Sequence, residues 1–162
     1  MSTRLENRIE KVFRVLDRLA EESGKGPIII VEGRKDVNTL RALAIEGNII
    51  CAKTCGRSLL DVVAEVDKKG VREVILLMDF DRRGKELTRR LTKHFEEIRI
   101  KSNLFFWIGL RNLVGREVKA IEGLATYLEN QKKKRLQARA RKFRGLGNSN
   151  SRVKREEQIR KV

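Results

Sequence analysis

Short apolar runs recur along the central part of the chain. Residues 28–31 form a continuous run of β-branched side chains, and similar runs lie at residues 48–51, 74–78 and 104–107. Runs of this length without polar alternation are typical of strands buried on both faces, as in a parallel sheet. The pattern predicts four short strands.

Segments with helical periodicity separate these runs. One lies between Asp36 and Gly47, a second begins at the capping residues Ser58 and Asp61, and a third follows residue 82. Residues 109–130 also have a mainly helical pattern. Strands that alternate with helices of about a dozen residues form right-handed crossovers, which place the strands in parallel and cover both faces of the sheet. The predicted fold class is α/β, with a Rossmann-like four-stranded parallel sheet flanked by helices.

The two ends of the chain differ from this central part. Apolar residues at helical spacing predict an N-terminal amphipathic helix over residues 3–22, followed by a loop with the only proline. Residues 131–162 carry 13 Lys and Arg against 2 Glu, with few apolar side chains. Such a segment builds no core and is predicted to be disordered until a partner orders it. We divide the chain into a helix and loop (1–26), a domain (27–130) and a basic tail (131–162).

The charge of the chain indicates its partner. Its 38 Lys and Arg against 22 Asp and Glu give a formal net charge of +16, and neutralising phosphates with so many cations favours nucleic acid. No secretory signal and no apolar run of about 18 residues is found, which argues against a membrane partner and for a cytoplasmic protein. Cys51 and Cys55 have no second cysteine pair nearby, so we interpret them as reduced thiols rather than zinc ligands.

Three carboxylates follow predicted strands directly. Glu32 directly follows the first strand, and Gly33 lets the backbone turn sharply behind it. Asp79 and Asp81 come after the third strand, where an extended backbone points both aspartates to one side. Ligands of open parallel sheets bind beyond the carboxyl ends of the strands. Carboxylates brought together repel unless they share a proton or a cation, and oxygen-only ligands select Mg²⁺, with Mn²⁺ as a substitute. Taken alone, each of these residues is more often a surface or helix-capping carboxylate, so the prediction rests on all three lying at strand ends. Asp36 is first a helix cap and second an outer partner of the metal.

The same segments resemble the two motifs of the Toprim family. Ile29-Ile-Val-Glu-Gly-Arg-Lys-Asp36 is similar to the first motif, an apolar strand that ends in Glu-Gly, and Met78-Asp-Phe-Asp-Arg-Arg-Gly84 is similar to the Asp-x-Asp motif. The layout is similar to small single-domain archaeal Toprim proteins and to the Toprim domains of the 5S ribosomal RNA maturation ribonuclease and bacterial-type primase. The resemblance implies a Toprim fold, Mg²⁺ binding by Asp79 and Asp81, and a role for Glu32 as metal ligand or catalytic general acid/base.

Basic residues near this site and in the tail are candidates for nucleic-acid binding. Those near the site are Arg34, Lys35, Arg82, Arg83, Lys85 and Arg89, and those in the tail are Lys132, Lys133, Lys134, Arg135, Arg139 and Arg141. Phosphate contacts position a protein without reading sequence, and arginine-rich segments that fold on binding are common in RNA recognition. RNA, including ribosomal RNA or ribosomal particles, is therefore the favoured partner.

Two functions remain open at this point. The first is a Mg²⁺-dependent enzyme acting on nucleic-acid phosphodiesters, as a nuclease-like factor in ribosomal RNA processing. The second is a non-catalytic RNA- or ribosome-binding factor that retains the metal site. A primase or topoisomerase is disfavoured because 162 residues offer no polymerising or strand-gating module. The sequence leaves the oligomeric state open.

Overall fold

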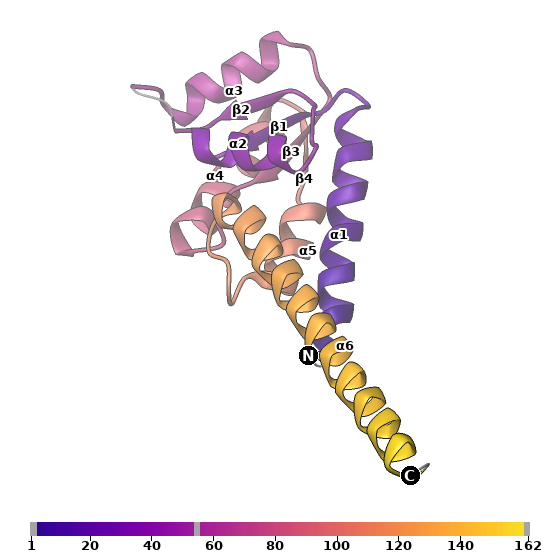
Figure 1. Ribbon diagram of the computed structural model, residues 1–162. Helices are drawn as coiled ribbons and strands as arrows, with labels where there is room; N and C mark the ends of the chain where they lie inside the picture. The colour runs from indigo at the N-terminus through magenta and orange to yellow at the C-terminus, as the bar shows by residue number, and fades with distance from the viewer. Residues whose placement is uncertain (1–2, 54–55, 161–162) are drawn as a thin grey trace.

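The computed structural model describes residues 3–53 and 56–160, with side-chain surroundings described as far as residue 145. The elements follow one another in the order α1 (Thr3–Ser23), β1 (Ile28–Val31), α2 (Arg34–Ala42), β2 (Ile49–Cys51), α3 (Leu59–Lys68), β3 (Glu73–Leu77), α4 (Arg82–Glu97), β4 (Lys101–Asn103), α5 (Phe105–Val114), the 3₁₀ helix η1 (Ile121–Gly123) and α6 (Leu124–Arg160) (Figure 1). Cys55 lies outside the described residues, whereas Cys51 is a half-buried free thiol.

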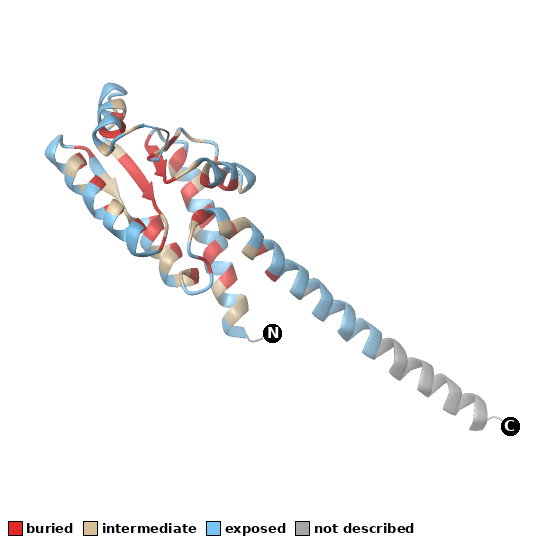
Figure 2. Cartoon of the chain, turned by 90° about the vertical axis from the view of Figure 1, so that its left-hand side faces the viewer, coloured by how far each residue is buried: buried red, intermediate tan, exposed pale blue. Residues whose placement is uncertain are grey.

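The strands form one parallel sheet in the order β2-β1-β3-β4. Alternate residues of the two central strands face opposite cores. Ile29 and Ile75 pack with α1, α2, α5 and the start of α6, whereas Ile28 and Val74 pack with α3 and α4. Burial on both faces explains the unbroken apolar runs, since every residue of β1 is buried. Figure 2 shows buried residues along the strands of the sheet. The predicted α/β class, with helices on both faces of a four-stranded parallel sheet, is confirmed.

The N-terminal helix is part of this body. α1 covers residues 3–23, as its periodicity predicts, and its buried residues join the same core as the sheet. It runs beside α5, where Val15 lies so near Gly109 that a Cβ added there would be 3.7 Å from it. Arg8 forms an ion pair at 2.9 Å with Glu117, which follows α5. The helix therefore stabilises one face of the sheet.

The prediction of a strand at residues 104–107 is wrong. The fourth strand is the polar segment 101–103 at the sheet edge, and Phe105 begins α5 after its backbone N–H donates to the Asn103 side chain at 3.0 Å. Phe106, Leu110 and Val114 are buried at helical spacing. A short apolar run does not by itself distinguish a buried strand from the first turn of a buried helix.

The basic C-terminal segment also differs from expectation in its backbone. α6 passes through the proposed boundary at residue 131 and through residues 145–151 without a break. Its last buried side chain within the described part is Gln131, and residues 136–145 are all exposed. The helix projects away from the body in Figures 1 and 2. The ordering of this segment by a partner stays a prediction.

Candidate metal centre

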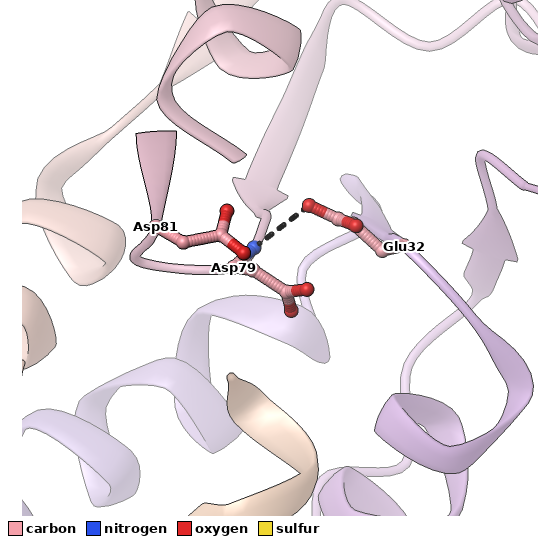
Figure 3. Close-up of side chains that lie close together, drawn as sticks. All are labelled: Glu32, Asp79 and Asp81. Carbon is pink, nitrogen blue, oxygen red and sulfur yellow. Dashed lines mark hydrogen bonds between the residues drawn. The ribbon is translucent and has the colours of Figure 1, made fainter. Parts of the chain in front are cut away.

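The three predicted carboxylates lie together at the carboxyl ends of β1 and β3. One carboxylate oxygen from each of Glu32, Asp79 and Asp81 lies within 4.8 Å of the others (Figure 3). Glu32 is buried, Asp79 is half-buried and Asp81 is exposed. The cluster therefore has one buried side and one side open to a ligand.

Both oxygens of Glu32 are held by neighbouring groups. Oε1 accepts a hydrogen bond from the Asp79 backbone N–H at 3.1 Å, which is drawn in Figure 3. Oε2 accepts from Lys53 Nζ at 2.9 Å and forms an ion pair with it. A carboxylate that is 6% exposed requires such partners, because an unpaired buried charge is costly.

Lys53 is the site residue that sequence reasoning missed. It lies just after β2, and its backbone N–H continues the parallel pairing by donating to the Glu32 carbonyl at 2.9 Å. The position of Lys53 in the sequence could have indicated this role, because the carboxyl end of the second strand lies on the same side of the sheet as those of the first and third. A lysine two residues beyond that strand reaches the carboxylate site.

The backbone that carries Asp79 is fixed from several elements. Trp107 Nε1 donates to the Met78 carbonyl at 2.9 Å, and the Phe80 N–H donates to the Lys119 carbonyl at 2.7 Å. These contacts come from α5 and from the loop after it. The helical segment 109–130 that the sequence pattern predicts is thus interrupted where the chain contacts the Asp-x-Asp segment.

Asp81 begins α4 as its N-cap. Its Oδ1 accepts from the Gly84 N–H at 2.7 Å, which satisfies one free donor of the first turn. Gly84 itself lies against the Asp79 backbone, so that a Cβ added to it would come within 2.9 Å of Asp79 Cα and closer to the carbonyl group. A glycine is required here by close packing.

Gly33 has a different role from the one expected. A glycine directly after Glu32 suggests a sharp turn of the backbone there, but the φ of −141° at Gly33 is ordinary extended backbone, and a Cβ there would meet no atom within 4 Å. Its backbone N–H donates to Asp36 Oδ2 at 3.0 Å, and Asp36 Oδ1 accepts from the Glu122 N–H at 2.9 Å. Buried Asp36 therefore helps to cap α2 and also anchors η1.

The clustering of acidic side chains shifts the pKa of Asp79. Burial, followed by the charges of Glu32 and Asp36, raises the pKa of Asp79 to about 7. Ionised Asp79 is thus unfavourable without a cation at neutral pH, because like charges and partial desolvation oppose it. Three oxygen ligands at this separation, with their open side toward solvent, fit a hard divalent ion that completes its coordination with water and phosphate.

The basic residues of α4 divide between two faces of the helix. Arg82, Arg83 and Arg90 line a groove of about 360 Å³ together with Lys53, Glu86 and Leu87. Lys85 and Arg89, which were predicted to bind the same ligand, lie on the other face of α4. Arg89 also forms an ion pair with Glu86 at 2.6 Å. Since Lys53 contacts Glu32 and lines the groove, the groove borders the carboxylate cluster.

The remaining predicted cations lie on α2 and α6. Arg34 and Lys35 are exposed in the first turn of α2, which begins just beyond Glu32. On α6, Arg135 is half-buried, and the other tail candidates, Lys132, Lys133, Lys134, Arg139 and Arg141, are exposed. Their role in nucleic-acid binding stays a prediction.

Comparisons with known proteins identify the family. The sequence model of the Toprim domain matches residues 26–104. The UPF0292 protein of Methanosarcina barkeri is 39% identical over 121 residues, which cover 75% of this chain and 82% of that protein. The chain belongs to the UPF0292 family. The UPF0292 protein of Methanocaldococcus jannaschii is 37% identical over 123 residues, which cover 75% of this chain and 93% of its own.

A solved structure is similar to this chain in fold. The structure of a putative protein from Aquifex aeolicus has a TM-score of 0.55 and 25% sequence identity, covering 67% of this chain and 94% of that one. Toprim domains bind divalent metal ions and act on nucleic acids, so this UPF0292 protein has a domain of metal-dependent nucleic-acid proteins, and its acidic triad can hold such an ion. Within the described residues, no helix is both long and apolar enough to span a membrane.

Gly84→Ala should damage both folding and the site. The added methyl group collides with the Asp79 backbone, so we expect the free energy of unfolding to fall by about 1–3 kcal/mol, as is typical of overpacking. Urea denaturation measures this change, and metal titration measures the displacement of Asp79. Gly33→Ala is the matched control, because its Cβ meets open space. Equal stability of the two variants would contradict the role given to Gly84.

Asp79→Asn should have opposite effects on stability and on metal binding. Because the folded-state pKa of Asp79 is raised to about 7, folding of the metal-free protein favours the protonated form, and stability falls as pH rises from about 4 to about 7. The asparagine variant lacks this loss and should be relatively more stable above pH 7. Metal affinity of the unmodified protein should rise through the same interval, because the ligand must be deprotonated.

Calorimetric titration with Mg²⁺ or Mn²⁺ in buffers of different ionisation enthalpy measures the released proton, and thermal unfolding measures stability. Asp67→Asn, an exposed change on α3, is the control. A metal affinity independent of pH between about 5 and 8 would rule out the raised pKa as a determinant of binding.

Proposed function

We propose that this UPF0292 protein is a Mg²⁺-dependent enzyme that cleaves phosphodiester bonds of nucleic acid, with structured RNA such as ribosomal RNA precursors as its substrate. The observation that carries the proposal is the convergence of three carboxylate oxygens within 4.8 Å beside a groove lined by arginines. The carboxylates suit a metal ion, and the groove suits the phosphates on either side of the bond to be cleaved.

Each residue of the site has a role in this proposal. Asp79 and Asp81 hold the ion, and Mn²⁺ can replace Mg²⁺. When bound, the ion supplies electrostatic stabilisation of the charge that develops on the phosphate. Glu32 is either a third ligand or the group that accepts or donates a proton, and the Asp79 N–H fixes its orientation. Lys53, whose side chain is 48% exposed, is able to move from Glu32 to a phosphate oxygen.

The choice of RNA is supported by the distribution of charge. The net charge of +16 exceeds what one small site requires. Many of the cations lie on the exposed part of α6, away from the carboxylates, and α6 resembles the arginine-rich segments common in RNA recognition. Contacts of this kind bind phosphates and orient a structured substrate without reading its sequence. We therefore assign α6 to substrate binding and the triad to chemistry.

Substitutions in the triad should abolish cleavage without abolishing RNA binding. Incubation with ribosomal and transfer RNA precursors and Mg²⁺ should give defined products, and Glu32→Gln, Asp79→Asn and Asp81→Asn should each reduce the rate by about 100-fold or more. Gel electrophoresis of the products and filter binding separate the two effects. Asp67→Asn should cleave normally. Cleavage unchanged by Glu32→Gln and Asp79→Asn would refute the enzymatic function.

A second function is favoured by one observation. Glu32 already has both oxygens occupied by protein groups, Lys53 Nζ and the Asp79 N–H, so the triad is compatible with a site that docks a phosphate without reacting. The protein would then be a non-catalytic RNA- or ribosome-binding factor that depends on α6.

Truncation after residue 135 tests this alternative. The shortened chain should keep its fold, because residues 136–145 are exposed and the buried residues of α6 precede them. Sedimentation with ribosomal particles should be lost on truncation and kept by Asp79→Asn. Full retention by the truncated chain would exclude a binding factor that acts through α6.

A further inference from the structure

A second depression lies on the face of α4 that does not border the carboxylates. It has a volume of about 410 Å³ and lies between α4 and α5. Its lining residues are Lys85, Thr88, Arg89, Thr92, Lys93, Glu96, Leu104 and Trp107. Nothing in the catalytic proposal uses this pocket, although it shares α4 with the metal site.

The floor of the pocket is apolar and rigid. Leu104 is half-buried, and Trp107 is only 5% exposed. The indole N–H of Trp107 donates to the Met78 carbonyl, and the Arg111 guanidinium lies 4.6 Å from the centre of its ring. Trp107 therefore has a fixed position, and through Met78 it contacts the backbone next to Asp79. Leu104 and the small exposed part of the indole therefore give the pocket an apolar floor against which the edge of a planar apolar group can pack.

The rim of the pocket is cationic. Lys85, Arg89 and Lys93 are exposed and recur every four residues along α4, so they form a row with steps of about 6 Å. Glu96 is the only acid that lines the pocket. The Arg89–Glu86 ion pair is exposed on both sides, and such pairs contribute little, so Arg89 is free to contact an anion instead.

We propose that this pocket binds a nucleotide of a single-stranded nucleic acid, with its base on Leu104 and Trp107 and its phosphates on the row of cations. The combination of an apolar floor with a cationic rim matches a nucleotide, which joins an apolar ring to an anion. The assignment rests on the proposed function only for the class of polymer, and it requires no cleavage.

The position of α4 explains how both sites would serve one strand. The helix begins at the carboxylates with Asp81, and its first turn sends Arg82 into the arginine groove and Lys85 into the second pocket. A strand that crosses this turn has phosphates on both faces of α4 and passes the triad between them. The pocket would thereby fix which phosphodiester bond faces the metal site.

Tryptophan fluorescence gives a direct test, because Trp107 is the only tryptophan of the chain. Full-length protein in EDTA is titrated with RNA and DNA oligonucleotides of one sequence and about ten residues in length. We expect a saturable change in Trp107 emission. Lys85→Ala/Arg89→Ala/Lys93→Ala should weaken binding about tenfold or more and reduce the salt slope by about 2, the value for three phosphate contacts to a single strand.

The controls separate the pocket from charge alone and from the metal site. Lys68→Ala/Lys69→Ala/Arg72→Ala removes three exposed cations at the end of α3 and just before β3, at the amino ends of the strands, and should bind almost normally. Thr92→Phe fills the pocket with the cations intact, so it should abolish the fluorescence change. The titration is done in EDTA and measures no cleavage, so a failure of the cleavage proposal leaves this test valid.

Three results would overturn the proposal: equal binding by the two triple variants, binding measured by anisotropy without any change in Trp107 emission, or an equal response to poly-glutamate, which would indicate an acidic peptide as the ligand. The first triple variant replaces only exposed side chains, so it decides the matter even if Thr92→Phe does not fold. A stronger response to the RNA than to the DNA oligonucleotide would assign the pocket to RNA, and the reverse would assign it to DNA.

Discussion

The contact between the first turn of α4 and the end of β3 determines the geometry of the site. Gly84 lies so close to the Asp79 backbone that no side chain fits between them, and its N–H binds the Asp81 carboxylate. The Asp79 N–H in turn binds Glu32. The positions of all three carboxylates therefore depend on one short stretch of backbone. Hydrogen bonds from Trp107 and to the Lys119 carbonyl hold this stretch in place.

This rigidity keeps like charges together. Relaxed side chains would separate, but burial and hydrogen bonds oppose that movement, and the pKa of Asp79 rises to about 7 as a result. Lys53 compensates Glu32 alone. Unfavourable electrostatics that the fold maintains at one place are typical of functional sites, where a ligand removes the strain. A divalent ion, which the triad can hold, would remove it here and add attraction for phosphate.

Particular residues show how far sequence reasoning reached. The central strands and the helices after them were predictable because burial on both faces of a sheet leaves unbroken apolar runs. The run at residues 104–107 was mistaken for a strand, because a run of four residues has the same composition in either element. The composition of the tail predicts disorder until a partner orders it, whereas its backbone is helical in α6, and its many Lys and Arg residues favour a helix.

The α/β class, the positions of Glu32, Asp79 and Asp81 at strand ends and the excess of positive charge could be read from the sequence, because each depends on local order along the chain. The folded structure was needed to show that Lys53 pairs with Glu32, that Gly84 rather than Gly33 is constrained, and that the cations of α4 divide between two faces. These features depend on which elements lie side by side in the fold, and the sequence of a single segment does not indicate which other segments pack against it.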